Sequence, residues 1–446
     1  MIVDSPDLDE DERFPKPLVA WGSTGLLMVL FAMAYLDRQI VALMVKPISA
    51  EFGVGDFEIS LLQGFAFAIF YAICALPLGM AVDRYPRRFI IMGGVLVWSL
   101  AAMACGLAES FNQLLFARVM VGAGEAALAP AAYSLLADLF PKRRLTFALS
   151  VFMLGATVGA ELSLALGGYI MAAAAEGASL PLLGLLPAWR FAFIVTGAPG
   201  LIIAFLALLI HEPPRTPAPA GSTGGWAEVF AFLSSRKLFF FCQMLGFSLV
   251  MALVYARFAW HPTFLMRTFG WSITQASYTL ATFGLVTTVF ALLTGGRLVD
   301  AWFGRGVTDA HYRYYVIGGI VLTVCGVAGY LSTDPRWFFA WMVLPALPLA
   351  MGAIGASAVQ VTTPPHLRGR VSAIYLLAVA LIGMSFGPAV VGYLTEHVFG
   401  RPEAIGLALA LTFGVLGPVV SVIFYIGRAP MRRAVAAVDQ LPTIRG

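Results

Sequence analysis

The chain has 446 residues, of which 60% are hydrophobic and 12% are charged, and its mean hydropathy is +0.86. Soluble globular proteins carry about 25% charged residues, so this composition excludes a soluble protein and indicates a polytopic membrane protein. The formal net charge is only +4, and the distribution of the charges along the chain says more than their sum.

The N-terminal stretch, residues 1–17, is predicted to be a cytosolic tail. It is acidic from Asp7 to Glu12, and the apolar run that follows is too long for the core of a signal peptide. We therefore expect no cleavable signal peptide.

Twelve apolar runs follow, each long enough to cross a membrane, which takes about 20 mostly apolar residues. They begin near Leu18, Ile59, Phe89, Phe111, Leu145, Phe191, Leu238, Thr274, Tyr314, Trp337, Val371 and Ala404. The sequence therefore predicts an all-α membrane protein with twelve transmembrane helices and with both termini on the same side.

The basic residues favour one orientation of these helices. Most Lys and Arg residues lie in the tails and in the even-numbered connections. The odd-numbered connections hold only Lys46, Arg190, Arg267, Arg336 and Arg401. Because cytosolic loops carry an excess of Lys and Arg, both termini are predicted to be cytosolic. The short loops favour a bacterial cytoplasmic (inner) membrane.

The connection after the sixth helix divides the chain into halves, because residues 211–225 are rich in Pro and Gly. Apolar residues recur at helical spacing from Trp226 to Leu233, which indicates either a short helix in the membrane interface or the start of the seventh span. We expect an N-terminal six-helix bundle at 18–211, a cytosolic linker at 212–236, a C-terminal six-helix bundle at 237–427 and a cytosolic tail at 428–446.

The two halves repeat each other's motifs. The fifth helix contains Gly155-x-x-x-Gly159, and the eleventh contains Gly383-x-x-x-Gly387. The second connection contains Gly79-x-x-x-Asp83, and the eighth contains Gly296-x-x-x-Asp300. Matching features in both halves predict two pseudo-symmetric bundles, an arrangement typical of secondary transporters.

Several kinds of chemistry are not expected. The cysteines Cys74, Cys105, Cys242 and Cys325 lie far apart in apolar runs, which predicts neither a disulfide framework nor a metal site. The sequence contains no P-loop, so ATP is not the expected energy source, and no catalytic motif of a hydrolase or metalloprotease stands out. We expect a protein that is not an enzyme and has no cofactor.

Charged residues inside the spans are the strongest functional candidates, because they are rare in membranes and usually face the interior. The first half places five of them in its spans: Asp37, Arg38, Arg118, Glu125 and Glu161. The second half has only Arg257 and His261. This asymmetry predicts that the first half couples to an ion while the second half mainly shapes the cavity. We interpret His261 as a packing residue, and Arg257 as binding an anionic headgroup or as snorkelling.

Asp37 and Arg38 are adjacent, and adjacent helical positions do not face one another, so their partners are predicted to lie on another helix. Arg118 and Glu125 are two turns apart on one face of the fourth helix. At about 1.5 Å per residue, Asp37 and Arg118 lie about 12 Å and 10 Å below the outer ends of their helices. Two acids among two arginines can load and release a proton as their pairing changes. A static salt-bridge network is the alternative, and Glu161 is a candidate accessory acid.

The connection between the second and third helices, Gly79-Met80-Ala81-Val82-Asp83-Arg84-Tyr85-Pro86-Arg87-Arg88, resembles the signature of the major facilitator superfamily. The resemblance covers nearly the whole chain and implies two six-helix bundles that rock around a central site. It also implies a cytoplasmic gate, whose residues here are Gly79, Asp83, Arg84, Arg87, Arg88, Asp138, Arg144, Asp300 and Arg305.

Finer motifs resemble the spinster branch of that superfamily, the proton-linked transporters of sphingolipids and lysolipids. They are Asp37-Arg38-x-x-x-Ala42, Gly122-x-Gly124-Glu125-Ala126 with Pro130, Asp138-Leu139-Phe140, Trp189-Arg190-Phe191 and Trp260-x-Pro262-x-Phe264-Leu265. The resemblance implies that Asp37 and Glu125 are the proton-responsive acids and that Arg38 and Arg118 are their partners. The eleventh helix departs from the animal members, with Ala380 and Met384 where they carry His and Asp.

The predicted function is therefore proton-coupled transport of an amphipathic lipid, of the sphingolipid or lysophospholipid type, by alternating access. Candidate substrate contacts, chosen by helical face, are Arg257, Phe65, Phe70, Phe247, Met251, Phe258 and Met351. One alternative is a proton-linked transporter of small organic anions, and another is a membrane sensor or structural protein that transports nothing. The expected partners are the substrate, protons and membrane lipids, without nucleic acid, and we expect a monomer.

Overall fold

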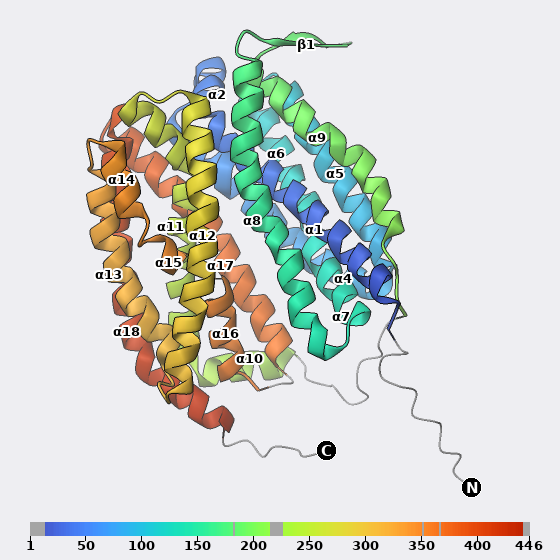
Figure 1. The fold of residues 1–446 in the computed structure, drawn as a ribbon, viewed down its shortest axis with the longest axis vertical. Coiled ribbons are helices and arrows are strands. Elements are labelled where there is room, and N and C mark those ends of the chain that lie inside the picture. The colour runs from blue at the N-terminus through green and yellow to red at the C-terminus, as the bar shows by residue number, and fades with distance from the viewer. Residues whose placement is uncertain (1–13, 182, 215–225, 350–351, 365–366, 440–446) are drawn as a thin grey trace. The chain divides into compact units, whose positions relative to one another are not determined.

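The structure is a computed structural model that describes residues 14–181, 183–214, 226–349, 352–364 and 367–439, and these residues are mostly helical (Figure 1). Its contacts divide the chain into two compact units. One unit comprises Met1–Phe52 and Ala66–Ala218, and the other comprises Gly53–Phe65 and Pro219–Gly446. Each unit has its own core.

The first unit is a helical bundle with one small sheet. Its elements are α1 (Pro17–Gln39), α2 (Val45–Phe52), α4 (Ala66–Arg84), α5 (Arg87–Leu107), α6 (Phe111–Glu125), α7 (Leu128–Leu139), α8 (Lys142–Ala173), β1 (Ala178–Leu180), β2 (Gly184–Leu186) and α9 (Ala188–Leu206).

The second unit is helical in all the residues that the structure describes as regular elements. They are α3 (Asp56–Ser60), α10 (Trp226–Ser235), α11 (Lys237–Phe269), α12 (Ile273–Gly304), α13 (Ala310–Tyr330), α14 (Pro335–Met342), α15 (Ala346–Leu349), α16 (Gly352–Thr362), α17 (Arg368–Tyr393) and α18 (Ile405–Asp439).

The predicted spans are present. Within the described ranges, eleven helical segments are long and apolar enough to cross a membrane. The twelfth predicted span, beginning near Trp337, consists of the shorter helices α14, α15 and α16. The all-α fold of twelve membrane segments is thus confirmed.

Three features of the fold were not predicted. The strands β1 and β2 pair in antiparallel fashion, and Ala178 lies opposite Leu186. The last span does not end near residue 427 but continues as α18 to Asp439, so most of the expected tail is helical. Residues Gly53–Phe65 belong to the second unit, although the same span continues from Ala66 in the first.

The repeated glycine pairs place two helices of each bundle in close contact. A Cβ atom on Gly155 or Gly159 of α8 would meet backbone atoms of α1, among them the carbonyl oxygens of Met28 and Ala32. In the second unit, Gly383 and Gly387 of α17 approach α11 in the same way, at Met251 and Ala252. Small residues allow helices in membranes to approach this closely. The internal repeat seen in the sequence therefore corresponds to equivalent helix pairs.

The short helix α10 is separate from the seventh span, because Arg236 between them leaves helical geometry, with φ −125° and ψ 35°. Val229 is buried on one face, whereas Trp226 and Phe230 are exposed. Arg236 donates a hydrogen bond to the carbonyl oxygen of Thr362 at 2.8 Å. This bond holds α10 at the end of the unit where α16 ends (Figure 1).

Candidate functional site

Asp37 and Arg38 lie in the last turn of α1, where backbone carbonyl groups are left without partners in the helix. The α-helix stops at Gln39 and continues as a 3₁₀-helix over Ile40–Leu43. The last carbonyl groups of an α-helix have no partner within the helix. Those of Asp37 and Arg38 are therefore available to side chains of other helices.

Glu125 lies at a break in the fourth span. The helix α6 ends at Glu125, and α7 begins at Leu128. Pro130 contributes to this break because a proline has no N–H for the carbonyl four residues earlier. The break places a carboxyl group at a helix end within the membrane-spanning segment, where it is 2% exposed.

Arg38 and Glu125 form a buried ion pair. Nη2 of Arg38 donates to Oε2 of Glu125 at 2.5 Å. The guanidinium carbon of Arg38 also lies 4.2 Å from the centre of the Phe67 ring and 4.5 Å from that of Tyr35. Aromatic faces attract cations at such distances. Arg38 therefore has an anionic partner and an aromatic support at the same time.

Arg118 joins α6 to α1 through backbone groups. Its Nη1 donates to the carbonyl oxygen of Asp37 at 3.0 Å, and its Nη2 donates to that of Arg38 at 3.2 Å. The Arg118 side chain is completely buried. The structure thus brings Arg118 level with the Asp37/Arg38 pair, as predicted, but binds it to the helix end and not to the carboxylate.

The carboxyl group of Asp37 receives no hydrogen bond within the part of the chain that the structure describes. Both of its oxygens are buried and accept no hydrogen bond from the described residues. Thr196 of α9 is the polar side chain beside it, but the Thr196 hydroxyl donates to the carbonyl of Ala192 at 3.0 Å. An isolated carboxylate is very costly to bury, and a proton removes that cost. Asp37 and Glu125 therefore sit in contrasting surroundings, one with a cationic donor and one without.

Glu161 is buried on α8, in the same unit as the four charged residues. Two residues later, Ser163 donates to the carbonyl oxygen of Leu36 on α1 at 2.8 Å. The α8 helix therefore contacts α1 directly beside Asp37. The accessory role of Glu161 stays a prediction.

Arg87 is the centre of a second polar cluster, and it comes from the predicted gate motif. It is completely buried and donates to Asp138 at 2.5 Å and to Glu212 at 2.7 Å. It also donates to Ser134 and to the carbonyl of Pro213. Glu212 in addition accepts the backbone N–H of Arg88 at 3.0 Å. The cluster fastens α5 to α7 and to the segment after α9.

The other predicted gate residues lie outside this cluster. Arg84, Arg144, Asp300 and Arg305 are exposed, and Gly79 has open space around it. The side chain of Asp83 lies outside the described residues. Glu212 was not predicted to take part, since the sequence places it in a Pro-rich linker far from Arg87 and gives no signal of their contact.

Two further ion pairs were not predicted. Their residues lie in or next to the odd-numbered connections, which the sequence analysis places on the outer side of the membrane. In the first unit, Glu51 accepts from Trp189 at 2.7 Å and from Arg190 at 2.6 Å. In the second unit, Asp56 accepts two hydrogen bonds from Arg267, at 2.6 and 2.8 Å. The first pair explains the Trp-Arg-Phe motif as a structural contact.

The candidate substrate residues are scattered in the structure. Phe65 and Phe70 are exposed, and Arg257 stacks on Phe258 at 5.0 Å. Met251 packs against Gly383. Met351 lies outside the described residues.

Phe247 differs from the expectation, because it is completely buried. Its ring packs edge-on against Tyr315, Tyr375 and Phe424. The helical face chosen from the sequence points into the core of the bundle, so Phe247 is a packing residue and not part of a cavity wall.

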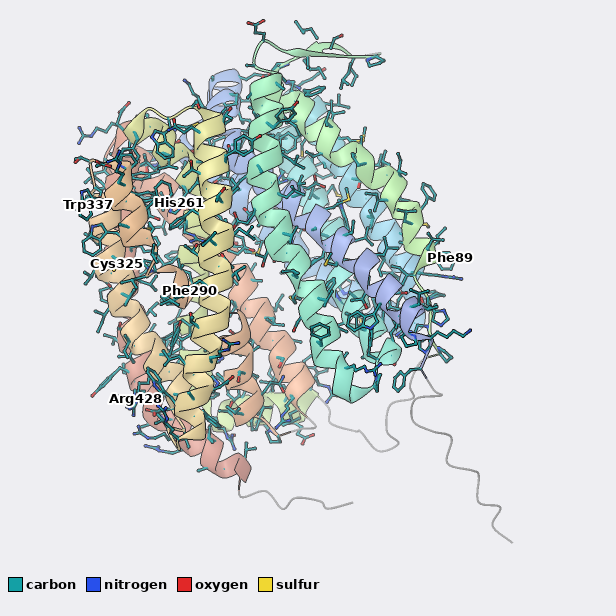
Figure 2. The ribbon with its side chains drawn as sticks, in the orientation of Figure 1. Phe89, His261, Phe290, Cys325, Trp337 and Arg428 are labelled. Atoms are coloured by element: carbon teal, nitrogen blue, oxygen red, sulfur yellow. The ribbon has the colours of Figure 1, made fainter. Side chains whose placement is uncertain are left out.

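His261 is buried, and its Nε2 lies 2.7 Å from the hydroxyl of Tyr330. It contacts the rings of Tyr330 and Phe338. This satisfied aromatic setting agrees with the prediction that it packs. His261 and Arg428 lie toward opposite ends of the second unit (Figure 2).

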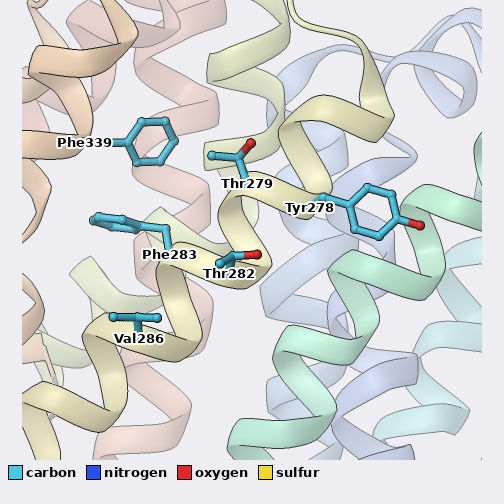
Figure 3. A pocket seen from close by; sticks show the side chains of 6 residues that line it. All are labelled: Tyr278, Thr279, Thr282, Phe283, Val286 and Phe339. Atoms are coloured by element: carbon cyan, nitrogen blue, oxygen red, sulfur yellow. The ribbon is translucent and has the colours of Figure 1, made fainter.

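A groove of about 540 Å³ lies between α12 and α14 (Figure 3). It is mostly apolar and is lined by Tyr278, Thr279, Thr282, Phe283, Val286 and Phe339. None of the predicted substrate residues lines it.

Comparisons with known proteins agree with this architecture. The profile of the Major Facilitator Superfamily matches residues 27–307. The chain is 29% identical over 439 residues to an MFS-type efflux pump of Mycolicibacterium smegmatis, covering 96% of each chain. It is 30% identical over 253 residues to human protein spinster homolog 1, covering 54% of this chain and 45% of the relative.

A solved structure of similar fold is a bacterial homolog of the human lysosomal transporter spinster, in an inward-facing and unoccupied conformation. Its TM-score is 0.78, its identity 24%, and the match covers 96% of this chain and 98% of that one. The resemblance to spinster proteins that the motifs predicted is therefore confirmed.

Proposed function

Because the chain belongs to the Major Facilitator Superfamily, a family of multi-pass membrane transporters, we propose that it is a proton-coupled secondary transporter of an amphipathic lipid. The proposed substrate is of the sphingolipid or lysophospholipid type, moved by alternating access. The observation that supports proton coupling is the contrast between Glu125, which accepts from Arg38, and Asp37, which accepts no hydrogen bond from any described residue.

The coupling we propose works through Arg38. With Glu125 ionised, the Arg38 guanidinium is neutralised, and a protonated Asp37 leaves no buried anion unpaired. When Glu125 takes a proton, Arg38 loses this ionic bond, while the rings of Phe67 and Tyr35 still lie against its guanidinium group. Asp37, the residue before Arg38, is then the acid whose ionisation restores the earlier net charge of the four residues.

Arg118 couples this exchange to the backbone. Since it donates to the carbonyl groups of Asp37 and Arg38, it fixes the end of α1 against α6. A change in charge at Asp37 or Glu125 alters the electrostatic field at Arg118. It therefore changes the strength of the hydrogen bonds by which Arg118 joins α6 to the end of α1. If the contact between α6 and the end of α1 has two arrangements, a proton that binds one of them better shifts the protein toward it.

The lipid substrate is supported by the motifs shared with spinster proteins and by the similarity to human spinster homolog 1. A small organic anion is the second candidate, favoured by the two buried guanidinium groups of Arg38 and Arg118. The predicted orientation, with both termini in the cytosol of a bacterium, is part of the proposal.

The test is transport in proteoliposomes. We expect a pH gradient to accelerate uptake of a fluorescent lysophospholipid at least tenfold, and we expect Asp37→Asn and Glu125→Gln to abolish that acceleration. Glu109→Gln is the matched control, because Glu109 is an exposed carboxylate at the start of the same span as Glu125.

Two results would contradict the proposal. Lysolipid uptake that ignores the pH gradient would remove the proton coupling. Proton-driven uptake of a small sugar acid, without any effect of excess lysolipid, would replace the lipid by the second candidate.

A further inference from the structure

The helices α13 and α18 of the second unit carry exposed apolar stripes that run toward one end of the bundle. On α18 the exposed residues include Val415, Val419, Val422 and Tyr425, which are three or four positions apart and so lie on one face. On α13 they are Ile317, Ile320 and Val324. Both stripes present apolar surface suited to acyl chains.

Each stripe ends in an arginine of the same helix. Arg313 lies four residues before Ile317, and Arg432 lies seven residues after Tyr425, so each shares a face with its stripe. Their side chains are 44% and 49% exposed. The two helices contact each other extensively through Gly319 and Gly417.

These two arginines and Arg428 surround one buried carboxylate, Asp309, whose side chain is 2% exposed. Arg428 donates to it through Nε at 2.6 Å and Arg432 through Nη1 at 3.0 Å. Arg313 Nη2 lies 3.5 Å from the other oxygen. We call these four residues the Asp309 cluster. Arg428 lies near the end of α18 (Figure 2).

The cluster retains a positive charge. Burial alone would raise the pKa of Asp309, but the hydrogen bond from Arg428 and the charges of Arg428, Arg313 and Arg432 outweigh it and lower that pKa. Asp309 is thus a carboxylate at neutral pH, and three guanidinium groups around it leave a formal charge of +2. Each guanidinium carries about five N–H donors, so many remain for an anion.

The cluster lies at the depth of a lipid headgroup. The 35 residues of α18 extend for about 52 Å, whereas the hydrocarbon core of a bilayer is about 30 Å thick. About 20 residues cross that core, which brings Tyr425 to its boundary and Arg428 beyond it. Arg313 lies in the first turn of α13, at the end that the distribution of basic residues assigns to the cytosol.

We propose that the Asp309 cluster binds the phosphate of an anionic phospholipid of the inner leaflet, with its acyl chains on the exposed stripes of α13 and α18. Arg313 and Arg432 contact the phosphate, and Asp309 and Arg428 hold them in place. Basic pockets between helices on the cytosolic side of membranes recognise such headgroups. The site lies wholly in the second unit, takes no part in the proton exchange at Asp37, and goes beyond the proposed function.

The experiment counts lipids bound to the purified full chain by native mass spectrometry, with phosphatidylglycerol and phosphatidylcholine as probes. We expect the wild type to bind phosphatidylglycerol at least fivefold more tightly than phosphatidylcholine, and Arg313→Gln/Arg432→Gln to lose that preference. The charge-keeping variant Arg313→Lys/Arg432→Lys should retain most of it. Arg433→Gln is the matched control, since Arg433 is exposed one residue away on another face of α18.

The thermal midpoint in phosphatidylcholine shows whether each variant is folded before lipids are compared. The proposal is overturned if the double glutamine variant, folded like the wild type, keeps the preference, or if Arg433→Gln loses as much. Displacement of phosphatidylglycerol by millimolar inorganic phosphate would likewise overturn it, because the site would then bind free phosphate and not a lipid.

Discussion

Replacing Arg87 by methionine should destabilise the first unit strongly, because a buried guanidinium then leaves two carboxylates behind. Arg87 is completely buried and bonds to Asp138 at 2.5 Å and Glu212 at 2.7 Å. Removing one partner of a buried ion pair costs about 3–5 kcal/mol. The two acids are 13% and 20% exposed, so water solvates them partly, and we expect about 3 kcal/mol.

The assay is thermal unfolding in detergent. A loss of 1 kcal/mol lowers the melting temperature by about 2–4 °C for a domain of about 200 residues, so Arg87→Met should lower it by about 6–12 °C. Arg84→Met is the control, since Arg84 is exposed in the same motif and its replacement should change the melting temperature by less than about 2 °C. Equal effects of the two substitutions would refute the assignment of Arg87 as the hub of the cluster.

Two further predictions concern packing and pH. Gly159→Val should prevent proper folding of the first unit, because a side chain would meet the backbone of Ala32. Gly93→Val is the control and should express and purify normally, because Gly93 has open space around it. Equal yields of the two variants would contradict the packing argument. Asp309→Asn should lower stability by about 1–2 kcal/mol at neutral pH. Because the folded-state pKa of Asp309 is lowered, this stabilisation is fully present above the unfolded-state value of about 3.9 and is lost as the pH falls through the folded-state value. The difference in melting temperature between wild type and Asp309→Asn should therefore be constant from about pH 7 to pH 5 and shrink only below about pH 4; a difference that shrinks near neutral pH would contradict the pairing of Asp309 with arginine.

The fold was largely predictable because apolar length alone identifies spans in a membrane protein. The close helix pairs were also foreseeable, since Gly155 and Gly159 recur as Gly383 and Gly387. The extension of α18 beyond residue 427 was missed because a basic segment looks like a tail. Its helix is held by long-range contacts, such as that of Arg428 with Asp309, which hydropathy does not reveal.

The sequence indicated which charged residues of the first unit lie close together, but not how they pair. Charge inside a span identified Asp37, Arg38, Arg118 and Glu125, and helical depth placed Arg118 level with Asp37. The sequence could not show that α1 changes to a 3₁₀-helix after Gln39, or that Arg118 donates to the carbonyl oxygens of Asp37 and Arg38 at that helix end.

Ion pairs between residues far apart in the sequence could not be predicted either. Arg87 lies 125 positions from Glu212, and an arginine with several acids within reach gives no local sign of which one it binds. Phe247 shows the converse limit. An aromatic residue on a spanning helix suits a cavity wall and a core equally well, and only its contacts with Tyr315, Tyr375 and Phe424 decide between them.

The central claim is that protonation of Asp37 and Glu125 drives the conformational cycle. The most direct test measures distance distributions between spin labels on the two units, at acid and neutral pH, in wild type, Asp37→Asn and Glu125→Gln. We predict that the distributions change with pH in the wild type and that each neutral substitution abolishes this change. Distributions that follow pH equally in all three proteins would contradict the claim, because the buried charges would then only hold α1 to α6.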